Sequence, residues 1–377
     1  MRRVGSFVLL GMAFASLAQK AVAEPVFLSK QYARCTTCHY SPTGGGLLTP
    51  YGRSLSRQEI STFGKGEPTQ QPDIAGREEA FLYGILGKSL GKVDVGIDVR
   101  PAYLNLDFGG ISDHRTLWMN ADLLAAYRVN GWTVYGEVGR QPTRDGSKID
   151  SYEYWFGHES EKGFGFRAGR FMPAYGIRLA DHTAYTRSGL GFDYYDQVYG
   201  LELSHTTDGH LVQLSMGPGR ADSIIHNDGR QAFTATGRFQ LDLNPRTTLV
   251  ASGLYRASSN VDPQNGAGGL AFGFAPTSRV SIWTEADTHF KQGTSGAPQY
   301  TLLGETSVEV YRGVWLKFSP QLRTAYGDTS GGLVRMAFEA NLFPRTHWNL
   351  GVSYYHDKNR ISDLVTKTFL LQLHLYL

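Results

Sequence analysis

Cysteine, charge and long apolar runs are all scarce in this chain of 377 residues. It contains 2 Cys, and 19% of its residues are charged. Two Cys cannot build the disulfide framework that holds many small secreted domains together. No apolar run reaches the ~18 uninterrupted residues of a membrane-spanning helix, which excludes a helical membrane bundle. The chain is instead rich in Gly (45), Tyr (21) and Phe (20), and so many aromatic side chains exclude a largely disordered protein.

The formal net charge of +3 comes from the N-terminus. Residues 1–23 begin with a basic stretch, continue through a short apolar run and end in an Ala-Val-Ala site, the pattern of a secretory signal peptide cleaved after Ala23. The run is too short for the alternative, a transmembrane anchor. This segment holds Arg2, Arg3 and Lys20 and no acid, so 34 of the 37 basic residues remain against 34 acidic ones. A neutral mature chain predicts no nucleic-acid partner.

Both Cys belong to one motif, Cys35-Thr36-Thr37-Cys38-His39. The spacing C-x-x-C-H is that of c-type haem attachment, in which two thiols bind the vinyl groups of one porphyrin and the next imidazole binds the iron. A redox disulfide would need a thioredoxin-like βαβ context, and a zinc site would need further Cys or His ligands, which residues 24–88 lack. We therefore expect one haem c, attached through Cys35 and Cys38, with His39 as the proximal iron ligand.

The haem segment, expected at 24–63, has too few large apolar side chains to form a core of its own. Thr49-Pro50 predicts the start of a short helix, with Thr49 as the N-cap. Arg53 on that helix is a candidate partner for a haem propionate, and an arginine solvated on the helix surface is the alternative. The segment contains no Met and no second His, so the sixth iron ligand comes from elsewhere in the chain, or a weaker group or water binds there. We expect a linker and the entry to the next unit at 64–91.

From residue 92 to 377 the sequence repeats about ten residues of alternating apolar and polar character, followed by a break. This alternation predicts antiparallel β-hairpins. The breaks are expected to be alternately short, as at Asn130-Gly131, and longer, the longest at 173–195. Such alternation, with an even number of strands, is typical of outer-membrane barrels and is not expected of a soluble β-sandwich. The sixteen expected strands are 92–108, 115–129, 131–140, 150–160, 163–172, 196–206, 209–217, 229–241, 246–258, 265–275, 278–291, 298–311, 313–325, 331–342, 346–357 and 364–377.

We therefore predict an all-β fold, a 16-stranded antiparallel transmembrane β-barrel at 92–377, located in the bacterial outer membrane. On the strand expected at 278–291, Trp283, Glu285 and His289 alternate with apolar residues and are assigned to the lumen. A barrel of this size encloses an aqueous interior that is wide enough for a plug. Because its apolar band is about 25 Å tall, a haem that moves electrons across the membrane needs to lie within the lumen. We expect the haem segment there.

The alternation also ranks the candidates for the distal haem ligand. His289 and His374 fall on the expected lumen faces and are the two candidates, although histidines in a lumen also serve as pore lining. Met119, Met216 and Met336 fall on lipid-facing positions. A shift of one residue in register would reverse each assignment.

The order of these features resembles that of the fused outer-membrane cytochrome–porins, a family proposed as iron oxidases in iron-oxidising bacteria. The matching residues are Cys35, Cys38, His39, Pro42, Leu47, Tyr51, Gly52 and Arg53. Gly44-Gly45-Gly46 lengthens the family's spacing, and Tyr51 stands where the family usually has Phe. The resemblance implies single-haem electron transfer between an extracellular donor, with Fe(II) as the leading candidate, and a periplasmic c-type cytochrome or another electron carrier.

The predicted function is therefore that of an outer-membrane electron conduit, either a pure electron-transfer protein or an Fe(II)-oxidising oxidoreductase. Its expected partners are membrane lipid, a periplasmic carrier and an extracellular electron donor or acceptor. Three other functions stay open: a passive diffusion porin with a haem-bearing plug, a small-molecule transporter, and a haem peroxidase or sensor with an open sixth site. The first two would not depend on haem, and the third needs an open iron position.

Overall fold

The structure is a computed structural model that describes residues 25–61, 63, 92–141, 148–193, 196–294 and 297–376. The predicted signal peptide (1–23) lies outside these residues, and so does the whole of the predicted linker (64–91). No helix among the described residues is long and apolar enough to cross a membrane.

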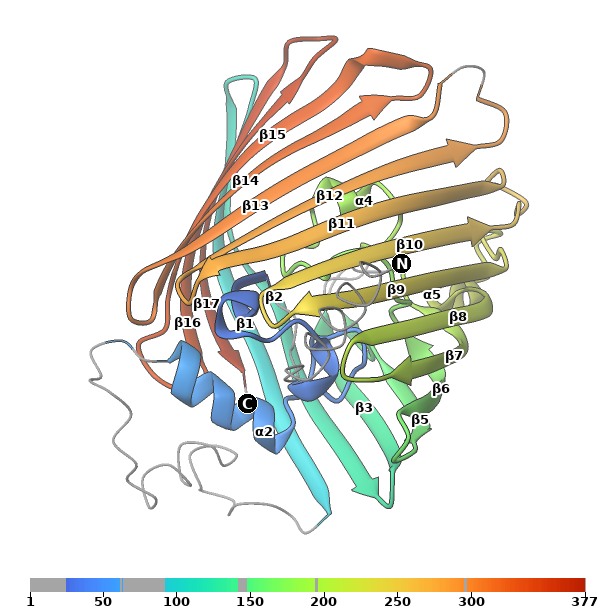
Figure 1. The fold of residues 1–377 in the computed structure, drawn as a ribbon. Helices are drawn as coiled ribbons and strands as arrows, with labels where there is room; N and C mark the ends of the chain where they lie inside the picture. Colours follow the sequence, from blue (N-terminus) through green and yellow to red (C-terminus); the bar gives the residue numbers. More distant parts are fainter. Residues whose placement is uncertain are drawn as a thin grey trace, which may run out of the picture.

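The described strands form one antiparallel sheet that closes on itself (Figure 1). Closure occurs where the first strand, β1 (Val93–Phe108), pairs with the last, β17 (Val365–Tyr376). On its other side β1 pairs with β2 (Ile111–Val129). The remaining long strands follow in chain order as β3 (Trp132–Gln141), β6 (Phe164–Phe171), β7 (Val198–Thr206), β8 (His210–Arg220), β9 (Thr234–Asn244), β10 (Thr247–Arg256), β11 (Asn265–Thr277), β12 (Val280–Lys291), β13 (Gln299–Tyr311), β14 (Val314–Ala325), β15 (Asp328–Leu342) and β16 (Trp348–Asn359).

The strand expected at 150–160 is split in two. β4 (Lys148–Asp150) and β5 (Tyr154–Glu159) both pair with β3, so they share one position in the wall. The seventeen strand segments described therefore make the sixteen-stranded barrel that the sequence predicts.

Two of the longer breaks that the sequence predicts are tight turns instead. β1 and β2 are joined by Gly109 and Gly110, which have φ of 59° and 89°, and β14 and β15 are joined through Gly327 at φ 73°. The strands β2 and β15 therefore begin at Ile111 and Asp328, earlier than expected. Their first residues are exposed to solvent on both faces, so no apolar alternation marks them as strand.

The alternation of the wall agrees with the prediction for the strand at 278–291. On β12, Trp283 and Glu285 are 2% and 3% exposed, whereas Ile282 between them is 36% exposed. Trp283 and Glu285 therefore face the filled lumen, and the apolar residues face outward. Met216 and Met336 are likewise exposed on the outer face, as predicted.

The N-terminal segment lies inside the barrel and is bonded to inward-facing side chains around the wall. The Trp283 indole donates to the Pro25 carbonyl (3.2 Å), Lys30 pairs with Glu309 (2.7 Å) and the Gln240 amide donates to the Ala33 carbonyl (2.7 Å). The prediction of a segment housed in the lumen is confirmed. Its elements are the 3₁₀ turns η1 (Pro25–Lys30) and η2 (Cys35–Thr37), the α-helix α2 (Pro50–Leu55) and the π-helical turn η3 (Ser56–Ile60).

The long connection between β6 and β7 also folds into the lumen. The Ile177 amide donates to the Glu285 carboxylate (3.3 Å), and the Tyr185 amide donates to Gln321 Oε1 (2.9 Å). The connection contains a short helix, α4 (Tyr185–Ser188), and the next connection at this rim contains α5 (Ala221–His226). Neither helix was predicted, because each is too short to show a period of 3.6 residues.

Candidate functional site

The C-x-x-C-H motif forms the tight turn η2. The amides of Cys38 and His39 both donate to the Cys35 carbonyl, at 3.1 and 3.0 Å. Side chains three residues apart eclipse one another in a 3₁₀ turn, so the two thiols lie on the same face. Both Cys are buried, and no disulfide joins them. Two thiols on one face, followed directly by an imidazole, are the donor set that a covalently attached haem needs.

A small hairpin and helix α2 hold this turn in place. His39 pairs with Leu48 in an antiparallel bridge, and the Thr49 amide donates to the Cys38 carbonyl (2.8 Å). The Thr49 hydroxyl accepts from the Gly52 amide (3.1 Å), which confirms Thr49 as the N-cap of the predicted helix. Gly52 itself packs directly on the backbone of Cys38. The sequence places the helix start because capping is local, but only the fold shows that the helix packs on the haem motif.

Buried charges fix the glycine-rich loop after the motif. Arg167 on β6 donates to the hydroxyls of Ser41 (3.3 Å) and Thr43 (3.4 Å) and to the Glu202 carboxylate (3.0 Å). The Ser41 hydroxyl donates in turn to Glu153 (2.8 Å). This network ties the loop to the barrel wall.

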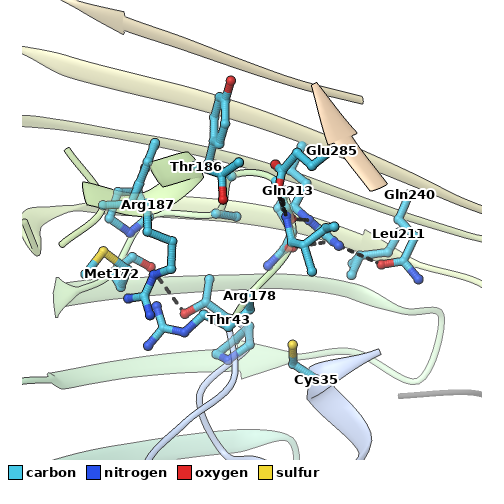
Figure 2. Close-up of a pocket in the computed structure, with 18 of the residues that line it drawn as sticks. Cys35, Thr43, Met172, Arg178, Thr186, Arg187, Leu211, Gln213, Gln240 and Glu285 are labelled. Atoms are coloured by element: carbon cyan, nitrogen blue, oxygen red, sulfur yellow. Dashed lines mark hydrogen bonds between the residues drawn. The ribbon is translucent and has the colours of Figure 1, made fainter. Parts of the chain in front are cut away.

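Cys35 borders a cavity of about 40 Å³ between the N-terminal segment, the β6–β7 connection and the strands β8, β9 and β12 (Figure 2). That volume is room for about three water molecules, so a porphyrin attached here takes space that neighbouring side chains now fill. The lining is Pro25, Cys35, Pro42, Thr43, Met172, Pro173, Ala174, Tyr175, Gly176, Ile177, Arg178, Thr186, Arg187, Phe192, Leu211, Gln213, Arg238, Gln240, Trp283 and Glu285.

Three arginines give the cavity a cationic lining: Arg178, Arg187 and Arg238. Arg238 donates to the Gly176 carbonyl (2.9 Å), to Gln213 (3.4 Å) and to Gln240 (2.8 Å), so its donors are already used by the protein. Arg187 is 7% exposed, and it donates from Nη1 to the Leu179 carbonyl (2.7 Å). None of the three was predicted. Arg178 and Arg187 lie in the long connection, where no strand alternation assigns a direction to side chains, and no motif marks Arg238 on β9.

Arg53, the predicted partner of a propionate, lies elsewhere. It is 4% exposed and donates from Nη2 to the Val95 carbonyl of β1 (2.7 Å), so the alternative of a solvated surface arginine is wrong. Burial lowers the pKa of Arg53, against the charge of Asp94. Arg53 does not line the Cys35 cavity.

The two predicted distal ligands do face the lumen, but neither lines the Cys35 cavity. His289 is 9% exposed and shares a hydrogen bond between Nδ1 and the Tyr326 hydroxyl (2.6 Å). His374 lies 3.0 Å from the Asp98 carboxylate. Of the described residues that do line the cavity, Met172 is the only Met or His, and it is 1% exposed. The one feature of the sequence near Met172 is Pro173, which follows it where β6 ends and the longest connection begins.

No family model matches the chain, and no curated protein matches it in sequence. Its fold does match solved structures. The loop-deletion mutant of OmpT from Vibrio cholerae gives a TM-score of 0.59 at 12% identity, over 76% of this chain and 99% of that one. OprB from Pseudomonas putida gives 0.60 at 7%, over 76% and 94%, and an anion-selective porin from Comamonas acidovorans gives 0.58 at 10%, over 76% and 99%. The chain has the fold of outer-membrane porins. At these identities the likeness concerns the fold alone.

Proposed function

We propose that this protein is an outer-membrane electron conduit, in which one haem c inside a porin-type barrel passes electrons between an extracellular donor and a periplasmic carrier. Fe(II) is the leading donor, and a c-type cytochrome is the leading carrier. The observation that carries the proposal is the position of the C-x-x-C-H turn. It lies in the lumen, enclosed by the wall and by the β6–β7 connection, rather than on a domain outside the barrel.

The residues around the turn fit a covalently bound haem. Cys35 and Cys38 would hold the porphyrin, and His39 would bind the iron. A bound haem would supply reversible one-electron transfer. Met172 is the residue of the cavity best suited to the sixth iron position, because a thioether is a common partner of His in electron-transfer haems.

The lumen position serves the function because the apolar band of a barrel is about 25 Å tall. A carrier docked at one rim and a donor at the other could not meet directly across that distance. Contacts with Gln240 on β9, and with Trp283 and Glu309 on the neighbouring strands β12 and β13, anchor the segment inside the wall. The same contacts oppose free diffusion of solutes through the lumen.

Vesicles test this function. Holoprotein is reconstituted into liposomes that enclose an oxidised soluble cytochrome c, and Fe(II) is added outside. We expect the enclosed cytochrome to be reduced by wild type and to stay oxidised with the Cys35→Ala/Cys38→Ala variant. Parallel vesicles that enclose ferrozine report any Fe(II) that crosses the membrane. Equal reduction by the haem-less variant, or reduction only where iron enters, contradicts the proposal.

A passive porin is the second candidate, favoured by the porin fold itself. It predicts solute flux and ion conductance that are the same in wild type and in the Cys35→Ala/Cys38→Ala variant. Planar-bilayer conductance of the two proteins separates the candidates, because the conduit requires no open pore. A peroxidase or sensor would instead show a high-spin ferric spectrum that changes with peroxide or carbon monoxide.

A further inference from the structure

Two arginines of the β6–β7 connection, Arg178 and Arg187, meet at the Cys35 cavity. In Figure 2 their side chains lie on the side of the cavity where Thr43 and Met172 are drawn. Arg178 runs along the glycine loop of the haem segment: a Cβ at position 44 would lie 3.0 Å from the Cys35 thiol sulfur and 3.6 Å from Arg178 Cγ. A Cβ at position 45 would lie 3.4 Å from Arg178 Nη2. The guanidinium of Arg178 is therefore close to the attachment point of the haem.

The two cations disfavour each other in this position. Burial lowers the pKa of Arg187 to about 10, and the charge of Arg178 adds to that effect. Two acids near Arg187 also have other partners: Asp181 lies 3.6 Å from the Arg335 guanidinium, and Asp193 lies 2.9 Å from His182 Nδ1. Burial opposes the charge of Arg178, but the hydrogen bond with Tyr152 and the charge of Glu153 outweigh burial and raise the pKa of Arg178. A further anion in the cavity, which both arginines line, would lower the cost of holding these two buried cations at one place.

We propose that Arg178 and Arg187 form a carboxylate-binding site at the Cys35 cavity, and that in the loaded protein they bind a propionate of the haem. Planar guanidinium groups match the two oxygens of a carboxylate, which lysine does not. Arg53 is not part of this site, because it does not line the cavity. Arg238 is not part of it either, because its Nε, Nη1 and Nη2 each donate to a protein acceptor, whereas the hydrogen bond from Arg187 to the Leu179 carbonyl uses Nη1. The assignment to a propionate rests on the proposed function, whereas the carboxylate site does not.

The first test measures the haem potential in Arg178→Gln, Arg187→Gln and the double variant. Loss of a cation beside the haem favours the oxidised, more positive state, so the midpoint potential should fall. We expect the midpoint potential of the double variant to fall by at least about 59 mV. At an applied potential equal to the wild-type midpoint, a fall of that size gives a tenfold excess of oxidised protein for a one-electron couple. Arg100→Gln is the matched control, because Arg100 also lies in the barrel, pairs with Asp98 and does not line the cavity. A double variant with the same potential as Arg100→Gln overturns the propionate assignment.

Folding and haem attachment are checked separately. Heat-modifiable gel mobility reports the folded barrel, and the pyridine haemochrome spectrum reports covalent haem. Arg178→Lys keeps the charge but not the planar fork. It should therefore fold where Arg178→Gln fails, and its haem midpoint potential should lie between those of Arg178→Gln and wild type. An Arg178→Lys potential that falls as far as that of Arg178→Gln would contradict the role of charge.

The second test uses succinate, a free dicarboxylate, to distinguish the two sources of carboxylate. Succinate should raise the melting temperature of the haem-less Cys35→Ala/Cys38→Ala protein, and the added Arg178→Gln/Arg187→Gln change should abolish this. The haem-loaded protein should not respond, because the propionate fills the site. A loaded protein that binds succinate overturns the propionate assignment, and a haem-less protein that ignores it overturns the carboxylate site. If wild type carries no haem at all, the conduit function fails, yet the succinate test still decides the site.

Discussion

Gly52 of helix α2 lies directly against the backbone of Cys38. A Cβ at position 52 would be 2.3 Å from the Cys38 carbonyl oxygen and 2.8 Å from its Cα, distances that no side chain can occupy. The helix therefore packs on the haem motif through the one residue type that permits the contact.

Gly52→Ala should push helix α2 away from the Cys38 backbone. Overpacking of this kind costs about 1–3 kcal/mol, so we expect reduced haem content and an N-terminal segment that proteases cut more readily. The haem-to-protein ratio from the haemochrome spectrum measures the first effect. Gly209→Ala is the matched control, because a Cβ there meets nothing within 4 Å. Equal haem content in the two variants would show that the contact with Cys38 is not required.

Arg167→Met should destabilise the barrel strongly. Arg167 lies 3.0 Å from Glu202 and 3.8 Å from Glu153, and all three side chains are at most 3% exposed. Removing the cation leaves two buried carboxylates unpaired, which costs about 3–5 kcal/mol. Urea unfolding, followed by the heat-modifiable gel shift, measures this.

Arg128→Met supplies the comparison for Arg167→Met. The side chains of Arg128 and its partner Glu159 are 50% and 52% exposed, so the same substitution there should cost less than about 1 kcal/mol. Similar unfolding midpoints for the two variants would mean that the Arg167 network contributes little to stability.

Met172→Ala should change the iron coordination of the loaded protein. If the Met172 thioether occupies the sixth position, its loss converts a low-spin haem to a high-spin haem and lowers the midpoint potential, since a Met ligand raises it. Visible absorption and potentiometry measure the two effects. His289→Ala and His374→Ala should leave both properties unchanged, because neither histidine lines the cavity. The reverse pattern would assign the position to whichever histidine changes the spectrum.

The contribution of Tyr40 to docking of the haem segment should be lost at alkaline pH. The Tyr40 hydroxyl donates to Asp94 of β1, and burial, with that hydrogen bond and charge, raises the pKa of Tyr40 above its ordinary value of 10.0. Because the folded pKa is the higher one, this contribution to stability is fully present below pH 10 and is lost as the pH rises through the folded pKa. Limited proteolysis across pH 7–12 measures it.

Tyr40→Phe is the control for that alkaline effect. The variant has no ionisable group at this position. Its N-terminal segment should therefore be cut more readily by protease at neutral pH, and its resistance to proteolysis should fall less above pH 10. A wild type that loses protection below pH 9 would point to another group.

The period of two residues identified the strands, because successive side chains along a barrel strand point alternately to the lipid and to the lumen, whatever the distant contacts are. It failed at the start of β2, where Ile111 and the residues after it face solvent on both sides. It also missed the interruption between β4 and β5, where Ser151 donates to the Glu137 carbonyl and to the Glu153 carbonyl (3.4 Å) instead of continuing the ladder. Those outcomes depend on surroundings that a local pattern does not contain.

The sequence by itself determined the barrel, because strand alternation is a short-range pattern. C-x-x-C-H is also a short-range pattern, and from it haem attachment at Cys35, Cys38 and His39 stays a prediction. Only the tertiary structure decided what surrounds that motif. Met172, Arg178 and Arg187 reach the Cys35 cavity because a long connection turns back into the lumen, and Arg53 is drawn away to the β1 backbone. Closure of the wall and insertion of the plug join residues far apart in the chain, and no spacing along the sequence specifies those contacts.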